Sequence, residues 1–214
     1  MKNVVIYGQG GFGKEIASLL QQINEVSPEW NLLGYIDDGL PVGTENRYGK
    51  VIGNMDTLFN WNEGELNVVV SIANPTVLNK IMETIHNPLI SFPNILAPNV
   101  NVFDEDAVKM GKGNVFFFGC RISCDVEIGD FNICVGLNSF GHDVKVGNCN
   151  VFSPSVRLSG CVTVGNQNFF GVGSIVLQGM KIGNNIRLGA GSVLMTKPKD
   201  GNLYMGNPAR KTEL

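Results

Sequence analysis

His142 and Asp143 are neighbours in a chain with only two histidines, and together they could carry out proton transfer. A neutral imidazole is suited to accept a proton near pH 7 from an attacking amine or hydroxyl group. A carboxylate beside the ring can fix its tautomer and stabilise the imidazolium that forms. An isolated exposed histidine is usually only a surface residue, so the surrounding elements decide whether this pair is a candidate base. We expect the other histidine, His86, to be structural or solvated.

The elements around His142 follow from a six-residue repeat. Every sixth residue from Met110 to Leu194 is apolar, and at every third step a glycine comes next: Gly111, Gly129, Gly147, Gly165 and Gly183. The pattern predicts a three-sided prism of parallel strands with eighteen residues per coil and nearly five coils over residues 110–195. We expect the glycines and asparagines at its corner to take positive φ. A β-sandwich is the alternative, but its strands and loops vary in length, whereas this register never slips.

The predicted prism stacks residues eighteen apart into columns. His142 is expected to point outward from a strand, with Asp143 at the following corner. Gly160 stands one coil later in the column of His142, where its missing side chain would leave space beside the imidazole. A second column, Val172 and Ala190, lies on another face.

The N-terminal segment predicts a small parallel sheet. A buried strand at residues 2–8 leads into GQGGFG, and the following KEIASLLQQI has helical spacing. Two further strands, NLLGYIDD and ELNVVVSIAN, and the helix PTVLNKIMETI continue the alternation of strand and helix. The segment PLISFPNILAPNV carries three prolines and is interpreted as the joint, which divides the chain into residues 1–90 and 91–214.

A ligand site is expected beyond the carboxyl ends of these strands, where the glycine loop and the pair Asp37 and Asp38 fall. Gly8, Gly10 and Gly13 fit G-x-G-x-x-G, which places backbone N–H groups and a helix N-terminus where a phosphate can bind. The alternative is that the glycines only allow close helix packing. The unit has about half the strands of a full dinucleotide domain, so the nucleotide portion of a larger substrate is favoured over NAD.

The composition excludes several function classes. The net charge is −3, charged residues make up 16% of the chain, and no basic run occurs, so neither nucleic acid nor an anionic membrane is an expected partner. The apolar run at the N-terminus is too short for a secretory or transmembrane segment, which predicts a soluble, cytoplasmic protein. Two histidines cannot build a three-histidine zinc site, and no metal is expected. The five cysteines form no C-x-x-C pair and are interpreted as reduced, structural thiols.

Several stretches together resemble the PglD/NeuD-like sugar acyltransferases: GQGGFGKEI, the strand end YIDD, the run GHDVKVGNCNVFSPSVRLSGCVTVG and the ending MGNPAR. The resemblance covers nearly the whole chain, and the order and spacing of the motifs are its most specific feature. Members of that family are homotrimers of left-handed β-helices. They transfer an acetyl group from acetyl-CoA to an amino or hydroxyl group of a sugar, commonly a UDP-linked 4-amino sugar. The resemblance therefore implies a Rossmann-like nucleotide-sugar-binding unit followed by a left-handed parallel β-helix.

The resemblance also implies roles for individual residues. His142 would be the catalytic base, and Asp143 the acidic residue that raises its basicity. The Gly160 backbone N–H would stabilise the oxyanion of the tetrahedral intermediate. Cofactor and substrate contacts are implied for Val172 and Ala190 with CoA, for Gly10, Gly11 and Phe12 with the nucleotide sugar, and for Asp37 and Asp38 with uracil.

Two departures from the family pattern leave the substrates open. Val151 stands where many members have a second histidine that contacts acetyl-CoA, and Phe12 replaces another frequent histidine. The favoured function is acetylation of the amino group of a UDP-linked amino sugar in surface glycan synthesis. O-acetylation of a sugar such as sialic acid is the alternative, and a non-catalytic trimeric nucleotide-binding scaffold is a second one.

Overall fold

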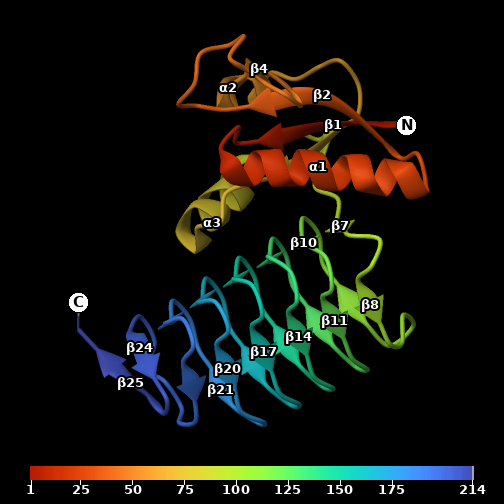
Figure 1. Cartoon of the computed structure of the whole chain (residues 1–214). Helices are drawn as coiled ribbons and strands as arrows, with labels where there is room; N and C mark the ends of the chain where they lie inside the picture. The colour runs from red at the N-terminus through yellow and green to blue at the C-terminus, as the bar shows by residue number, and fades with distance from the viewer. Residues whose placement is uncertain (214) are drawn as a thin grey trace.

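The computed structural model describes residues 1–213, and it contains an α/β unit followed by a long prism of short strands (Figure 1). The last strand of the first sheet, β6, ends at Ser91, and the first strand of the prism, β7, begins at Ile95. No helix among residues 1–213 has the length and hydropathy needed to cross a bilayer.

The α/β unit is built on a six-stranded sheet in the order β3-β4-β2-β1-β5-β6, with only β3 and β4 antiparallel. Its strands are β1 (Lys2–Tyr7), β2 (Trp30–Ile36), β3 (Glu45–Asn46), β4 (Gly49–Gly53), β5 (Leu66–Val70) and β6 (Ile90–Ser91). Its helices are α1 (Gly11–Val26), α2 (Met55–Phe59) and α3 (Pro75–Thr84). The three expected strands and two expected helices are all present. The elements that the sequence did not predict, β3, β4, α2 and β6, have only two to five residues each.

Two of the helices begin in different ways. Asn74 caps α3, since its side chain accepts hydrogen bonds from the Thr76 and Val77 N–H groups, and Pro75 occupies the first turn. Gly10 stands at the N-cap of α1 and has no side chain to offer. The N-terminus of α1 therefore keeps N–H groups available for another partner.

The prism has three faces of parallel two-residue strands, except that the four-residue strands β24 and β25 at its C-terminal end pair antiparallel (Figure 1). The β10 face contains β7 (Ile95–Leu96), β10 (Val115–Phe116), β13 (Ile133–Cys134), β16 (Val151–Phe152), β19 (Phe169–Phe170), β22 (Arg187–Leu188), β24 (Leu203–Gly206) and β25 (Ala209–Thr212). The β14 face contains β8 (Asn101–Val102), β11 (Arg121–Ile122), β14 (Ser139–Phe140), β17 (Arg157–Leu158), β20 (Ile175–Val176) and β23 (Val193–Leu194). The β15 face contains β9 (Lys109–Met110), β12 (Glu127–Ile128), β15 (Lys145–Val146), β18 (Thr163–Val164) and β21 (Lys181–Ile182).

Residues eighteen apart pair on successive coils, as Ser139 pairs with Arg157, so the predicted period is confirmed. The prism begins earlier than the repeat suggested, because β7 forms a rung within the proline-rich joint and β8 forms one directly after it. Of the fifteen residues in the predicted inward column, all but the partly buried Met110 are buried in one continuous core. Burial of these apolar side chains away from water is the main contribution that holds the coils together.

The expected reason for the corner glycines was wrong. Gly147 and its counterparts one coil away do not have positive φ, whereas Cys149, two residues later, has a φ of 57°. A Cβ on Gly147 would clash with the Asn166 side chain and lie 2.7 Å from the Gly165 carbonyl oxygen. The glycine is needed because successive coils approach closely at this corner.

A buried ladder of asparagines holds the same corner together. The side chains of Asn114, Asn132, Asn150 and Asn168 are fully buried and hydrogen-bond one another from coil to coil. Each of these amide groups also binds backbone atoms, so buried polar groups are satisfied along the corner.

The α/β unit packs against the β10 face. Two apolar clusters join residues of its sheet and helices to strand residues of this face, among them Val115, Ile133 and Val151. The rings of Phe12 in α1 and Phe117 in the prism lie 5.5 Å apart between their centroids. Neither of these clusters contains a strand residue of the β14 or β15 face.

Candidate active site

His142 lies in the turn that joins β14 to β15, at the corner between the β14 and β15 faces. The expectation that it stands on a strand was wrong, because each rung has only two strand residues and β14 ends at Phe140. Its outward position was expected, and the residue is exposed. Stacking fixes the turn, since the Asp143 N–H donates to the Cys124 carbonyl and the Cys161 N–H donates to the His142 carbonyl at 2.8 Å.

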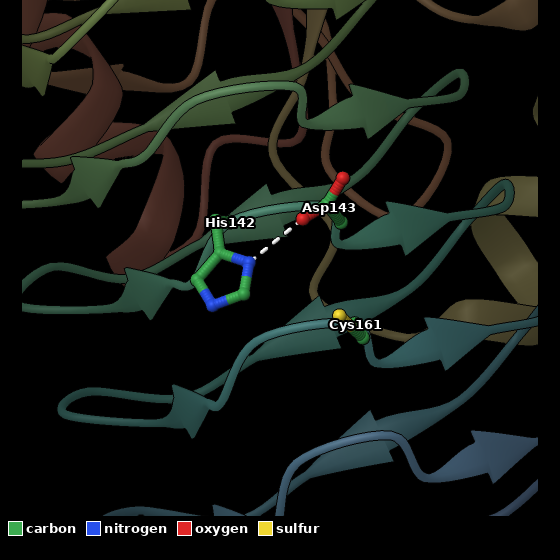
Figure 2. A group of neighbouring side chains, drawn as sticks. All are labelled: His142, Asp143 and Cys161. Carbon is green, nitrogen blue, oxygen red and sulfur yellow. Dashed lines mark hydrogen bonds and ion pairs between the residues drawn. The ribbon is translucent and has the colours of Figure 1, made fainter.

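The imidazole and the neighbouring carboxylate are paired. His142 Nδ1 and Asp143 Oδ2 lie 2.7 Å apart, and Figure 2 shows the ring turned with this nitrogen toward the carboxylate. A carboxylate accepts hydrogen bonds, so the neutral ring keeps its proton on Nδ1 and leaves the Nε2 lone pair free. The two side chains are 56% and 58% exposed, so a substrate can reach the pair from solvent. The pair has the form of a general base with an orienting acid.

Gly160 stands directly against the imidazole, one coil further along. A Cβ at this position would contact His142 Nε2 and would lie 2.7 Å from Cε1 and 3.0 Å from Cδ2. The predicted column is therefore present, but the space left by the glycine is filled by the ring rather than left for a thioester. The Gly160 N–H has no hydrogen-bond partner among residues 1–213, and the residue is buried beneath the imidazole.

Cys161 belongs to the same cluster, although it was expected to be structural. Its Sγ, one His142 ring nitrogen and one Asp143 oxygen all lie within 4.8 Å of one another, and all three residues are exposed (Figure 2). The sequence did contain a sign of this contact, because Asp143 and Cys161 are eighteen residues apart and so stack on successive coils.

The buried cysteines fit the structural interpretation. Burial raises the pKa of Cys120 to about 11 and that of Cys149 to about 12, and raises the pKa of Cys134 well above its ordinary value. Thiols of this kind are poor nucleophiles. His86 is exposed, as expected, and lies outside the cluster.

Val172 and Ala190 lie at a different corner, between the β10 and β14 faces, and both are exposed. Val172 is 54% exposed and shares this corner with the exposed side chains of Phe118 and Leu137. One chain therefore does not bring the expected CoA contacts together with His142. Val151, where the second histidine of the family was missing, is buried beneath the α/β unit.

A cavity of about 560 Å³ lies at the carboxyl ends of β1 and β2, where the nucleotide site was expected, and Tyr7, Gly8, Asp37, Asp38 and Lys80 are among its lining residues. Both carboxylates already accept hydrogen bonds within the chain. Asp37 accepts from the Gln9 and Gly39 N–H groups, and Asp38 accepts from the Tyr7 hydroxyl and the Met55 N–H. Burial and the bond to Asp38 raise the pKa of Tyr7 above its ordinary value. The aspartates thus fix the glycine loop and α2 at the rim of the cavity.

The glycine loop separates into two kinds of positions. An added Cβ would meet nothing within 4 Å at Gly10 or Gly11, so the N-terminus of α1 is open, as a phosphate site requires. Gly13 is buried and approaches the Gly8 carbonyl so closely that a Cβ would clash with it, which is the packing role considered as the alternative. Phe12 packs against Phe117 between the two units rather than in the cavity.

A second cavity, of about 470 Å³, was not predicted. It lies between α1 and the corner that carries Val172, and its lining includes Lys14, Arg47, Phe117 and Leu137. Its residues come from elements distant in the sequence, so no local motif marks it.

Comparison with known proteins connects both units to sugar acetyltransferases. Residues 3–85 match the family model described as the PglD N-terminal domain. Perosamine N-acetyltransferase (PerB) from Caulobacter crescentus, solved with CoA and GDP-perosamine, is 27% identical, and the match covers 100% of this chain and 98% of PerB with a TM-score of 0.87. A variant of that enzyme with one histidine replaced by asparagine, bound to the same ligands, matches with a TM-score of 0.89. The acetyltransferase domain of PglB from Neisseria gonorrhoeae is 24% identical, with 99% of this chain and 100% of that chain covered and a TM-score of 0.88. No curated protein matches the sequence.

The resemblance inferred from the motifs is confirmed. The α/β unit matches the PglD N-terminal domain over residues 3–85. The expected fold class is confirmed as well: an α/β unit is followed by a left-handed parallel β-helix of hexapeptide rungs, and the match to this combination covers 98% of PerB and 100% of the PglB domain. Among these neighbours are sugar N-acetyltransferases that bind CoA or acetyl-CoA as co-substrate.

Proposed function

We propose that this protein is an acetyl-CoA-dependent acetyltransferase in surface glycan synthesis. Its acceptor is the amino group of a nucleotide-linked amino sugar, and the expected nucleotide is UDP. The observation that carries the proposal is the His142–Asp143 pair, whose free Nε2 lies beside the unpaired Gly160 N–H. The PerB match at 27% identity supports both the donor and the amino acceptor.

The proposed reaction uses these groups in one order. Nε2 of His142 accepts a proton as the sugar amine attacks the thioester carbonyl carbon. The carbonyl oxygen becomes negatively charged in the tetrahedral intermediate, and the Gly160 N–H stabilises it. The C–S bond then breaks, the imidazolium returns its proton to the CoA thiolate, and the amide remains on the sugar. Asp143 holds Nδ1–H throughout and stabilises the imidazolium between the two proton transfers.

The site requires a second copy of the chain. The PglD N-terminal domain covers the β10 face, whereas His142 lies at the opposite corner of the three-sided prism. The expected CoA contacts, Val172 and Ala190, lie at a third location within the chain. A homotrimer arranged as a closed ring would place the His142 corner of one subunit beside the Val172 corner of the next. The exposed apolar side chains of Phe118, Leu137 and Val172 support a contact at that corner.

The acceptor would bind at the PglD N-terminal domain. The open N-terminus of α1 at Gly10 and Gly11 offers N–H groups to a diphosphate, and the neighbouring cavity that contains Asp37 and Asp38 is large enough for a base or a sugar. The expected base is uracil. PerB was solved with GDP-perosamine, so a GDP-linked amino sugar is the alternative acceptor that any test must include.

The test is an acetyl-transfer assay with a panel of acceptors. Purified protein is incubated with acetyl-CoA and with UDP-linked and GDP-linked amino sugars, and CoA release and amide formation are both measured. The proposal expects amide formation with the UDP-linked amino sugar and a loss of about 10²- to 10⁴-fold in kcat for His142→Ala. Acetylation only of hydroxyl groups would support the O-acetyltransferase alternative. Nucleotide binding in calorimetry without any acetyl-CoA binding would support the scaffold alternative and contradict the proposal.

A further inference from the structure

The cluster of His142, Asp143 and Cys161 combines three kinds of metal-ligating atoms on a rigid corner. One ring nitrogen, one carboxylate oxygen and Sγ lie within 4.8 Å of one another, and all three residues are exposed to ions in solution. Asp143 and Cys161 occupy the same position of successive coils, with φ values of 57° and 59°. Hydrogen bonds between coils fix both backbones, so the prism, and not a mobile loop, brings the thiol beside the carboxylate.

We propose that these three side chains form a binding site for a borderline transition-metal ion such as Zn²⁺, and that the bound ion switches off the catalytic base. Imidazole nitrogen, carboxylate oxygen and thiolate sulfur are the ligands that Zn²⁺ prefers, at about 2.0 to 2.3 Å from the metal. Ligand atoms around a tetrahedral ion are then about 3 to 4 Å apart, a spacing that small rotations of exposed side chains can reach from the observed cluster. Mg²⁺ and Ca²⁺ take oxygen ligands and would not use this set.

Binding would change the proton on the imidazole. Nδ1 is the ring nitrogen that faces the carboxylate (Figure 2). A metal ion bound at Nδ1 replaces the hydrogen there, and the neutral ring then carries its proton on Nε2. Cys161 binds as a thiolate and releases its proton to solvent. Nε2 has no lone pair left for the sugar amine, so metal binding inhibits transfer without any movement of the fold.

The test separates metal binding from activity. Co²⁺ is the spectroscopic probe, because cobalt bound to a thiolate gives a charge-transfer band in the near ultraviolet. The wild-type protein should show this band and Cys161→Ser should not. Cys124→Ser is the matched control, since Cys124 is only partly exposed, lies one coil before the cluster and should not contribute to the band.

The effect on catalysis rests on the proposed function and is measured in the acetyl-transfer assay. Zn²⁺ should inhibit the wild-type enzyme, and a chelator should restore the activity. Cys161→Ser should keep the basal rate and need at least about tenfold more Zn²⁺ for the same inhibition.

The outcomes distinguish the parts of the proposal. A cobalt band that persists in Cys161→Ser, or no band in the wild-type protein, would overturn the metal site. Full activity with the metal bound would overturn the block of the base. A thiolate band in a protein that acetylates none of the sugars would support the site and count against the proposed function alone.

Discussion

Gly160→Ala tests whether the position of the imidazole controls the chemistry. The added Cβ would lie 2.7 Å from Cε1 of His142 and closer still to Nε2. The ring must move by about 1 Å to regain ordinary contact distances, and a displacement of this size at a reacting group can cost about 10²-fold in rate. This loss corresponds to about 2.7 kcal/mol of transition-state stabilisation.

The same substitution should leave the fold intact. Gly160 does not have positive φ, so alanine suits its backbone. The His142 side chain is more than half exposed, so the displaced ring can turn into solvent without opening the core. We therefore expect the thermal midpoint to stay within about 2 °C of the wild-type value, because the exposed ring and not the core accommodates the added methyl group.

The assay is a double-mutant cycle on kcat for acetyl transfer. If Gly160→Ala acts through the ring, it should lower kcat about 10²-fold in the wild-type background and have almost no further effect in a His142→Ala background. An unchanged kcat in a folded Gly160→Ala protein would refute the proposed position of the base. An equal loss in both backgrounds would show that alanine acts on the oxyanion site and not on the imidazole.

The other predictions concern the acid, the acceptor site, the oligomer and the ladder. Asp143→Asn should lower kcat about tenfold, far less than in a buried triad, because water already surrounds more than half of this carboxylate; an unchanged kcat would exclude an orienting role. Gly11→Glu should raise the KM for the nucleotide sugar at least about tenfold without destabilising the protein, since its carboxylate suits the helix N-terminus but competes with a phosphate, and Gly11→Ala is the control. Mixing His142→Ala with Gly11→Glu subunits should restore roughly one quarter of the wild-type sites if each site joins two chains in a closed ring, whereas a site within one chain would stay inactive. Asn150→Ala should lower the free energy of unfolding by about 3 kcal/mol in denaturant titrations, because it leaves buried partners in the ladder unpaired; a loss below about 1 kcal/mol would contradict this role.

The sequence predicted what depends on side-chain pattern and missed what depends on backbone detail. The inward column from Phe116 to Leu194 was predicted because burial selects apolar residues at a fixed period. The exact limits of the rungs were not predicted, because a strand of two residues is too short to show an alternating pattern. For this reason His142 was expected on a strand, whereas it lies in a turn. Phe12 could not be placed, since its partner Phe117 lies on another element more than a hundred residues away.

The nucleotide site illustrates a further limit. A sequence shows that Asp37 and Asp38 follow a buried strand, which is a position where ligands bind in α/β sheets. It does not show that the Gln9 N–H, the Tyr7 hydroxyl and the Met55 N–H already occupy those carboxylates. These donors come from three segments that only the folded sheet brings together.

The catalytic corner depends on the repeat in a more direct way. Stacking at eighteen residues places Gly160 under His142 and Cys161 under Asp143. The same spacing therefore produces both the base with its unpaired backbone donor and the thiol beside its acid. The ring can stay over the Gly160 backbone only while that position has no side chain, and the amide can serve an oxyanion only while no neighbouring carbonyl binds it. Changing the spacing by a single residue anywhere between the two coils would separate these groups, even though every side chain of the site would still be present. The proposed chemistry therefore depends on the register of the prism as much as on the identity of the residues.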